Sequence, residues 1–537
     1  MSTAYPHAST IARELGVSLA QVERTVALLA EGATIPFIAR YRKEVTGNLD
    51  EVQIAAVDER RTYLTELDAR KQTVLGEIDK QGKLTDALKA KIVGTLSKTE
   101  LEDLYLPYKP KRRTRATIAR ERGLEPLAEK ILAQEPLAET REALAAPFVG
   151  GEVPDVEAAY AGARDIVAEM VAERAEVRAA LREQALDGGF VVGAAIAGKE
   201  EEGAKFKDYF NFRQDAKALP SHRLLALRRG EAEGFLRVAL EVDGDAARDL
   251  VRHKVIVAPK APLMRELDAA IVDAYERLLK TSIEVDVRLV LKDRADADAI
   301  KVFAGNLRAL LLQSPLGGKR VLAIDPGYRT GCKVAVIDDK GDLQTHDVVF
   351  PTQSERKIDE AAATLERLCK QHRIEAVAIG NGTAGRETET FVRKLAADRR
   401  LGAVKVVVVN EAGASVYSAS EIAREELPSE DVTVRGAVSI GRRLQDPLAE
   451  LVKIDAKSIG VGQYQHDVHQ PTLKKALDQV VESCVNAVGV DVNTASVKLL
   501  QYVAGVGETL AKNIVGYRAA NGPFRARRGL LQVPRLG

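Results

Sequence analysis

Residues 321–337 read VLAIDPGYRTGCKVAVI, and this stretch decides how the second half of the chain folds. Two apolar runs with β-branched residues flank a break that carries Pro326 and Gly327, which predicts a strand, a turn and a second strand. Asp325 stands where the first strand ends, a place where a carboxylate can meet a metal ion or a phosphate. An ordinary hairpin in which Asp325 caps the turn is the alternative that this stretch alone leaves open.

The segments after this hairpin extend it into a mixed sheet. A polar turn at 338–342 leads to a third short strand at 346–350, and a helix is expected from about 354 to 372. A strand at 376–379, a helix at 386–397, a strand at 405–409 and a further helix after 413 complete the order βββαβαβα. Functional groups of such a sheet gather where its strands end.

This order resembles the ribonuclease-H-like domains of the YqgF group. The resemblance implies a possible metal site, because nucleases of this fold hold two divalent metals with three or four acids. Asp325 matches the first acid, and Asp446, on the last expected helix, resembles the last one. The middle positions read Gly380-Asn381-Gly382 and Asn410, and an asparagine lacks the negative charge that Mg²⁺ needs.

A substitute acid is available nearby in the sequence. Glu387, Glu389 and Glu411 lie close enough to the middle positions to replace the expected carboxylates. The candidate catalytic group is therefore Asp325, Asp446 and Glu411, and the candidate metal ligands are Asp325 and Asp446. The degenerate pattern favours a protein that is not an enzyme and has no cofactor, with Mg²⁺ bound only if this site is active.

A second motif lies near the end of the chain, where residues 499–518 read LLQYVAGVGETLAKNIVGYR. This is the pattern of a helix-hairpin-helix, in which two glycines let the backbone approach a phosphate and the next helix presents unpaired N–H groups. Such a site binds backbone and not bases. A tight turn between two packed helices is the alternative.

The charge of this region favours nucleic acid. From Lys498 to Gly537 the chain has seven basic residues and one acid, Glu508, which is the expected electrostatic footprint. Residues 533–537 resemble the beginning of a second hairpin without its following helix, so the second hairpin is expected to be incomplete. The candidate contacts here are Gly505, Gly507, Lys512, Arg518, Arg525, Arg527 and Arg528.

The amino-terminal half shows apolar residues mainly at helical spacing, which predicts a helical array. Thr10 to Arg24 has the small residue, glycine turn and apolar spacing of a helix-turn-helix, although two packed helices would give the same pattern. Phe235 to Val242 alternates apolar and polar residues and predicts a strand, with Val255 to Val257 as its possible partner.

Two basic segments of this half are candidates for contact with phosphates. Residues 105–115 read YLPYKPKRRTR, and cations beside tyrosines suit a single strand, although a solvated loop is an equal alternative. Residues 33–44, ATIPFIARYRKE, carry apolar residues that need a core and are expected to fix one helix against another. The candidate contacts of the first segment are Lys109, Lys111, Arg112, Arg113 and Arg115.

Taken together, these segments resemble the Tex family of bacterial transcription accessory proteins. The stretches that carry the resemblance are 32–50, 104–115, the hairpin at Asp325, NEAGASVYS at 410–418 and IGVGQYQHDV at 459–468. The resemblance implies binding of RNA or DNA linked to transcription, and RNA polymerase as a possible partner. It also implies a carboxy-terminal OB-fold that binds RNA, which this sequence does not show.

The composition agrees with a large cytoplasmic protein. The net charge of +1 means that any binding of nucleic acid must come from local patches. Cys332, Cys369 and Cys484 lack paired spacing and predict buried thiols in a reducing compartment. No apolar run is long enough for a membrane helix or a signal peptide, so no membrane partner is expected.

Four domains are expected: a helix-turn-helix-like region at 1–75, a helical core with a small β element at 76–313, the ribonuclease-H-like domain at 319–455 and the helix-hairpin-helix region at 456–537. Three functions remain open. The first is a non-catalytic scaffold that binds nucleic acid in transcription, the second is a metal-dependent nuclease related to junction resolvases, and the third is a platform that binds the transcription machinery.

Overall fold

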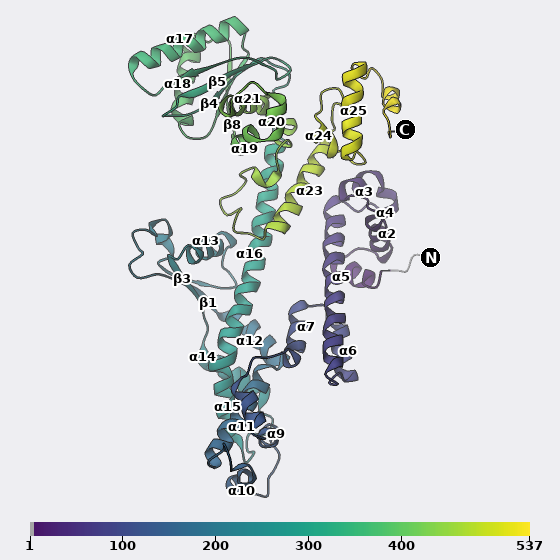
Figure 1. Ribbon diagram of the computed structural model, residues 1–537, viewed down its shortest axis with the longest axis vertical. Helices are drawn as coiled ribbons and strands as arrows, with labels where there is room; N and C mark the ends of the chain where they lie inside the picture. Colours follow the sequence, from purple (N-terminus) through teal and green to yellow (C-terminus); the bar gives the residue numbers. More distant parts are fainter. Residues whose placement is uncertain (1–4, 537) are drawn as a thin grey trace. The chain divides into compact units, whose positions relative to one another are not determined.

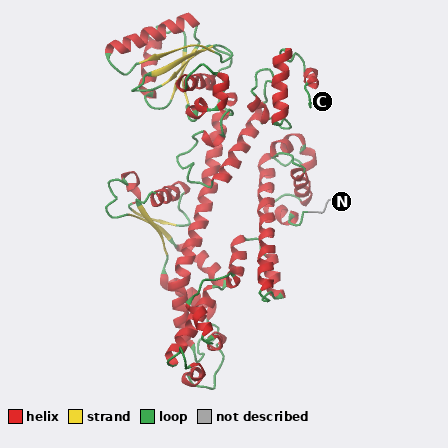
Figure 2. Cartoon of the chain, in the orientation of Figure 1, coloured by secondary structure: helices red, strands yellow, loops and turns green. Residues whose placement is uncertain are grey.

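The computed structural model describes residues 5–536 and shows the predicted class of fold, a mainly α-helical multidomain protein with one embedded α/β domain (Figure 1 and Figure 2). The chain divides into two compact units. The first unit comprises the chain up to Val26 and Ala55–Ala297, and the second comprises Ala27–Ile54 and the chain from Asp298 onward. Three helices, α2 (Leu19–Ala30), α5 (Glu51–Lys80) and α16 (Lys280–Leu311), each have residues in both units.

The first unit is a helical array with one small sheet. Its remaining elements are α1 (Ala8–Leu15), α6 (Asp86–Gly94), α7 (Lys98–Tyr105), η1 (Leu106–Tyr108), α8 (Arg115–Glu121), α9 (Glu125–Ala133), α10 (Arg141–Ala145), η2 (Ala146–Phe148), α11 (Val156–Ala172), α12 (Ala175–Gly188), β1 (Phe190–Ala195), η3 (Ala204–Tyr209), β2 (Asn211–Asp215), α13 (Ser221–Ala232), β3 (Leu236–Glu241), α14 (Gly244–Val255), α15 (Met264–Asp273) and the π-helix η4 (Ala274–Leu279).

The predicted helix pair at 10–24 is confirmed as α1 and α2. Gly16 ends α1 in the left-handed region, with φ of 67°, and this is the backbone conformation that a glycine adopts without strain. Ser18 and Gln21 then exchange hydrogen bonds between side chain and backbone, which starts α2. The structure therefore has the two helices and the turn of the motif.

The small sheet corrects one prediction. The strand expected at 235–242 is present as β3, but its partner is β1, in the antiparallel order β2-β1-β3. Val255, the expected start of a partner strand, ends α14 instead. The three basic residues of the last turn of α14 favour this helix end electrostatically, and that signal outweighs the short β-branched run.

The second unit holds the α/β domain and the carboxy-terminal helices. Its remaining elements are α3 (Ile35–Tyr41), α4 (Lys43–Thr46), β4 (Val321–Asp325), β5 (Cys332–Ile337), β6 (Leu343–Val349), α17 (Glu355–His372), β7 (Ala376–Gly380), α18 (Gly385–Ala397), β8 (Lys405–Val409), α19 (Ala414–Ala419), α20 (Glu421–Glu426), α21 (Val432–Gln445), α22 (Pro447–Leu451), η5 (Ala456–Ser458), α23 (Gln470–Val488), α24 (Val497–Gln501), α25 (Glu508–Asn521) and η6 (Arg527–Gln532).

The predicted order βββαβαβα is confirmed. The strands lie in the order β6-β5-β4-β7-β8, with β5 antiparallel to β4 and with β4, β7 and β8 parallel. The third strand begins earlier than expected, at Leu343. Since β4 and β7 are central strands, nearly all of their residues are buried on both faces.

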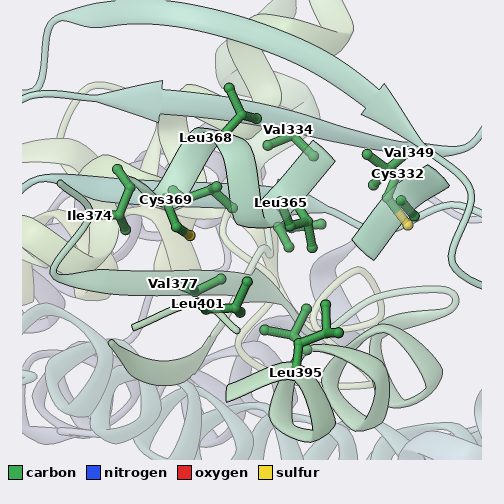
Figure 3. Close-up of a cluster of buried hydrophobic side chains, with 14 of the residues drawn as sticks. Cys332, Val334, Val349, Leu365, Leu368, Cys369, Ile374, Val377, Leu395 and Leu401 are labelled. Atoms are coloured by element: carbon green, nitrogen blue, oxygen red, sulfur yellow. The ribbon is translucent and has the colours of Figure 1, made fainter. Parts of the chain in front are cut away.

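Each face of this sheet has its own hydrophobic core. Leu322 and Ile324 of β4 pack with α17 and α18 on one face, in the cluster that Figure 3 shows. Val321 and Ala323, which alternate with them, pack with α21 on the other face. Cys369 lies in the first cluster, where burial raises the pKa of its thiol to about 12, in keeping with the expectation of buried thiols.

The amino-terminal segment Ala27–Ile54 belongs to the second unit because it packs on α23. Thr34, at the start of α3, is hydrogen-bonded to Glu482, and Ser483 donates to Glu51 Oε2 at 2.9 Å. Ile35, Pro36 and Ile38 are buried, so this segment does fix one helix against another, as its apolar residues predict. The same part of α23 also bonds the segment between α24 and α25 through Asn486.

Candidate nucleic-acid interface

The helix-hairpin-helix is present, with α24 and α25 joined by residues 502–507. Gly505 has φ of 85°, whereas Gly507 has φ of −74° and is the residue that precedes α25. An added Cβ would meet nothing within 4 Å at either position, so both glycines lie open to an approaching ligand. Because Gly507 has no side chain to cap α25, the first N–H groups of this helix remain free for a phosphate.

A buried asparagine on α23 positions this hairpin. Asn486 accepts a hydrogen bond from the Ala504 N–H at 2.9 Å and donates one to the Tyr502 carbonyl at 2.8 Å. It also donates to the Glu482 carbonyl at 2.7 Å, within its own helix. Asn486 was not among the predicted residues, because it lies on the opposite side of α23 from the apolar residues Leu473, Leu477, Val481 and Cys484, and the sequence gives no signal of its burial.

The basic residues around the hairpin divide into exposed and engaged ones. Lys512 is exposed and pairs with Glu508 at 2.7 Å, and Arg525, Arg527 and Arg528 are exposed as well. Arg518, in contrast, donates to the Val492 carbonyl at 2.7 Å, and burial lowers its pKa. Arg518 therefore joins α25 to the loop between α23 and α24, which leaves it poorly placed as a phosphate contact.

The basic segment at 109–115 is largely neutralised by acids. Lys109 pairs with Glu102 at 2.6 Å, and hydrogen bonds from Arg70 and Lys109 lower the pKa of that carboxyl to about 2. Lys111 lies between Glu169, at 3.2 Å, and Glu173. The remaining three cations of the segment, Arg112, Arg113 and Arg115, are exposed. Arg113 also pairs with Glu121 at 2.7 Å.

The expected stacking of bases on the tyrosines of this segment is wrong for Tyr105. That side chain is 7% exposed and belongs to the core of the first unit. Arg70 and Lys109 cover its ring, at 5.4 and 5.5 Å from the ring centroid. The apolar ring is buried because the residue ends α7 on the core side of that helix, a position that local charge does not reveal.

The ribonuclease-H-like domain brings two carboxylates together at the ends of its parallel strands. Asp325 ends β4 and Glu411 follows β8. Burial raises the pKa of Asp325 to about 6, the charge of Glu411 adds to this shift, and Lys333 opposes it. Within the described part of the chain, Glu411 Oε2 is buried and has no hydrogen-bond partner.

The glycines after β7 make room for the carboxylate of Glu411. A Cβ at Gly380 would lie 2.2 Å from Glu411 Oε2, and one at Gly382 would lie 1.6 Å from Oε1. Asn381 accepts a hydrogen bond from the Glu411 N–H at 3.1 Å. The segment where a second acid was expected is therefore the cradle of an acid that comes from the neighbouring strand.

The other predicted acids lie outside this pair. Asp446 is exposed and caps α22 by accepting from the Ala449 N–H at 3.0 Å. The residue of α21 that lies over Asp325 is Gly436, whose added Cβ would be 3.2 Å from Oδ2. Because Asp446 follows ten residues later, it lies about 15 Å further along the axis of α21. The expectation that Asp446 joins Asp325 in one site is wrong.

Glu387 and Glu389 are engaged elsewhere on α18. Glu387 is exposed and hydrogen-bonded to the Tyr328 hydroxyl, and Glu389 accepts from Arg393 at 2.7 Å. Among residues 5–536, no group of three or more His, Cys, Asp or Glu side chains is arranged to hold a metal ion. The carboxylates present do not fit a two-metal nuclease centre, which uses three or four acids.

Comparison with known proteins finds family models for the helical, ribonuclease-H-like and helix-hairpin-helix regions of the chain. Family models match the chain at residues 6–79 (Tex-like protein N-terminal domain), 137–303 (Tex central region-like), 319–445 (Tex protein YqgF-like domain) and 485–537 (helix-hairpin-helix motif). These matches define a nucleic-acid-associated protein of transcription that combines a helical array with ribonuclease-H-like and helix-hairpin-helix parts.

Three relatives extend this result to nearly the whole chain. Transcriptional accessory protein Tex of Neisseria gonorrhoeae is 49% identical over 532 residues, which is 98% of this chain and 70% of that protein. Protein tex of Bordetella pertussis is 50% identical over 542 residues, covering 98% and 68% of the two chains. The human S1 RNA-binding domain-containing protein 1 is 35% identical over 534 residues, 95% and 53%. The chain belongs to the Tex family.

The buried Asp325 predicts a stability that falls as pH rises. Because its folded pKa lies above that of an unfolded aspartate, the native state holds a proton between about pH 4 and 6 that the unfolded state has lost. Asp325→Asn removes this cost, so we expect it to stabilise the protein by about 2–3 kcal/mol at pH 7.5 and by little near pH 4. Urea unfolding at both pH values measures the difference. The exposed Asp339→Asn is the control, and a less stable Asp325 variant at pH 7.5 would contradict the interpretation.

Asn486→Leu tests the support of the hairpin. The change leaves the Ala504 N–H and the Tyr502 carbonyl without their partner, and each unsatisfied group costs about 1–3 kcal/mol. We expect faster hydrogen exchange at the Ala504 amide and a lower free energy of unfolding. Asn521→Leu, at the exposed end of α25, makes the same replacement and should change neither quantity by as much.

Proposed function

We propose that this chain is an accessory factor of transcription that grips the phosphate backbone of RNA or DNA without catalysing a reaction on it. The observation that carries the proposal is the open hairpin before α25, with its free N–H groups and with Lys512, Arg525, Arg527 and Arg528 exposed in the same region. N–H groups and exposed cations recognise phosphate, which every sequence presents. The name of the relative from Neisseria gonorrhoeae supports the link to transcription.

The non-catalytic part of the proposal rests on the carboxylate pair. Asp325 and Glu411 give two acids where a two-metal centre uses three or four, and Gly436 stands where α21 passes over Asp325. We propose that the ribonuclease-H-like domain serves as a structural support for binding and needs no Mg²⁺. A nuclease reaction remains the second candidate, and the unpartnered Glu411 Oε2 is the observation that favours it.

We further propose a protein partner in the transcription machinery, such as RNA polymerase, and a cytoplasmic location. Val285 and Leu289, one turn apart on α16, are 52% and 56% exposed and supply apolar surface for such a contact. Within the part of the chain that the structure describes, no helix is long and apolar enough to cross a membrane.

Gly507→Val tests the hairpin directly. The backbone at 507 accepts any residue, and the new side chain has open space around it, so the fold is expected to survive. The branched side chain should keep a phosphate away from the α25 amides and weaken binding by about 1–3 kcal/mol. Fluorescence anisotropy with single- and double-stranded RNA and DNA, titrated with salt, measures the loss.

Gly516→Val is the matched control, because it makes the same change at an exposed position of α25 away from the hairpin. Affinity should fall steeply with salt and vary little with base sequence. The proposal fails if Gly507→Val binds as tightly as the control. Incubation of the same oligonucleotides with Mg²⁺ or Mn²⁺ should leave them intact, and cleavage that Asp325→Asn abolishes would establish the nuclease instead.

A further inference from the structure

One turn of α23 connects the hairpin to a second exposed basic surface. Asn486 holds the hairpin, and Glu482, one turn earlier on the same helix, is hydrogen-bonded to Thr34 at the start of α3. Burial raises the pKa of Glu482, in keeping with its position between the two segments. The amino-terminal segment and the hairpin are thus supported by the same turn of one helix.

The end of α3 and the start of α4 present three cations and an aromatic ring to solvent. We call Arg40, Tyr41, Arg42 and Lys43 the α3–α4 patch. All four are exposed, and Tyr41 is 53% exposed although it is a large aromatic residue. The apolar residues Ile35, Pro36 and Ile38 form the buried side of α3. The packing of α3 therefore does not account for the exposed residues of the patch.

The arrangement of the patch suits a single-stranded nucleic acid. Exposed cations attract phosphates, and an exposed ring among them provides a stacking surface for a base. The ring of Tyr41 lies 5.5 Å from that of Phe37, and Arg42 lies over Phe37 at 5.1 Å, which holds the patch in place. Glu44 is the one acid that directly follows these residues in the chain, and it leaves the local charge positive.

The path through α3 and α23 gives an order-of-magnitude distance between the two surfaces. The seven residues of α3 span about 10 Å, the step from Glu482 to Asn486 is about 6 Å, and the width of a helix is about 10 Å. The patch and the hairpin therefore lie within about 30 Å of each other. A strand with about 3.4 Å per nucleotide covers this distance in about nine nucleotides.

We propose that the α3–α4 patch is a second contact for the strand whose backbone the hairpin grips, with phosphates on Arg40, Arg42 and Lys43 and a base stacked on Tyr41. This inference rests on the proposed function. It adds a stacking contact that favours single strands, since bases paired in a duplex do not present their faces.

The test measures binding of the full chain to single-stranded oligouridylate of about 4 and about 16 nucleotides. Arg40→Gln/Arg42→Gln/Lys43→Gln should lower the slope of log affinity against log salt by about 2 for the longer strand, because each phosphate contact contributes about 0.7. Tyr41→Ala should weaken binding of the longer strand about fivefold or more at every salt concentration and leave the slope unchanged. Neither variant should change binding of the short strand at the hairpin.

The control removes three exposed cations from the ribonuclease-H-like domain, Lys340→Gln/Lys370→Gln/Lys394→Gln, and should leave both strands bound as before. If the patch variants match this control while Gly507→Val loses affinity, the patch is not a contact and the hairpin proposal stands. If the patch variants lose affinity and Gly507→Val does not, the patch is a contact and the hairpin proposal fails. If the unchanged chain binds neither strand, both proposals fall.

Discussion

The hydrogen bonds of Asn486 are the interaction on which the candidate interface depends. A hairpin that approaches phosphate must keep its own N–H groups free, so it cannot be stabilised by the same groups that bind the ligand. Asn486 resolves this conflict by bonding Tyr502 and Ala504, just before the open glycines. Because the amide is buried, the bonds form away from competing water, and the hairpin is held in shape before any ligand arrives.

Internal contacts also determine the arrangement of the candidate site in the ribonuclease-H-like domain. The fold presents the ends of β4, β7 and β8 at one edge, which is where an α/β sheet places functional groups. In this chain that edge is closed by internal contacts: Arg443 of α21 donates to the carbonyls of Asn410 and Ala412 at 2.9 and 2.7 Å. The carboxylate of Glu411 lies against Gly380 and Gly382, at the end of the neighbouring strand β7. These contacts fix the loop after β8 and leave Asp325 with one acidic neighbour.

The strands and helices of this domain could be predicted because their signals are local. Apolar runs with glycine turns define β4 to β8, and the order of elements then defines the fold. Glu411, a predicted substitute acid, does lie near Asp325, whereas the place of Asp446 could not be predicted, because it depends on which residue of α21 crosses β4. Gly436 and Asp446 lie on the same helix, and the sequence does not show that the first one lies over Asp325. In the sequence, Gly380 and Gly382 stand where a second acid is expected. In the structure, their lack of a side chain leaves the space that the Glu411 carboxylate occupies.

The two basic segments of the amino-terminal half show the same limit of prediction from the sequence. The segment at 105–115 and the α3–α4 patch look alike in sequence, since each mixes tyrosine with several cations. In the fold, the first lies beside Glu102, Glu169 and Glu173, and its first tyrosine is buried. These acids are distant in sequence or are placed by helix packing, so local composition overstates the free charge of that segment. The sequence predicts phosphate contacts for 105–115, and it assigns 33–44 to helix packing because the apolar residues of that segment need a core. A chain with a net charge of +1 can bind a polyanion only where its cations remain unpaired with acids, and the fold determines where that is.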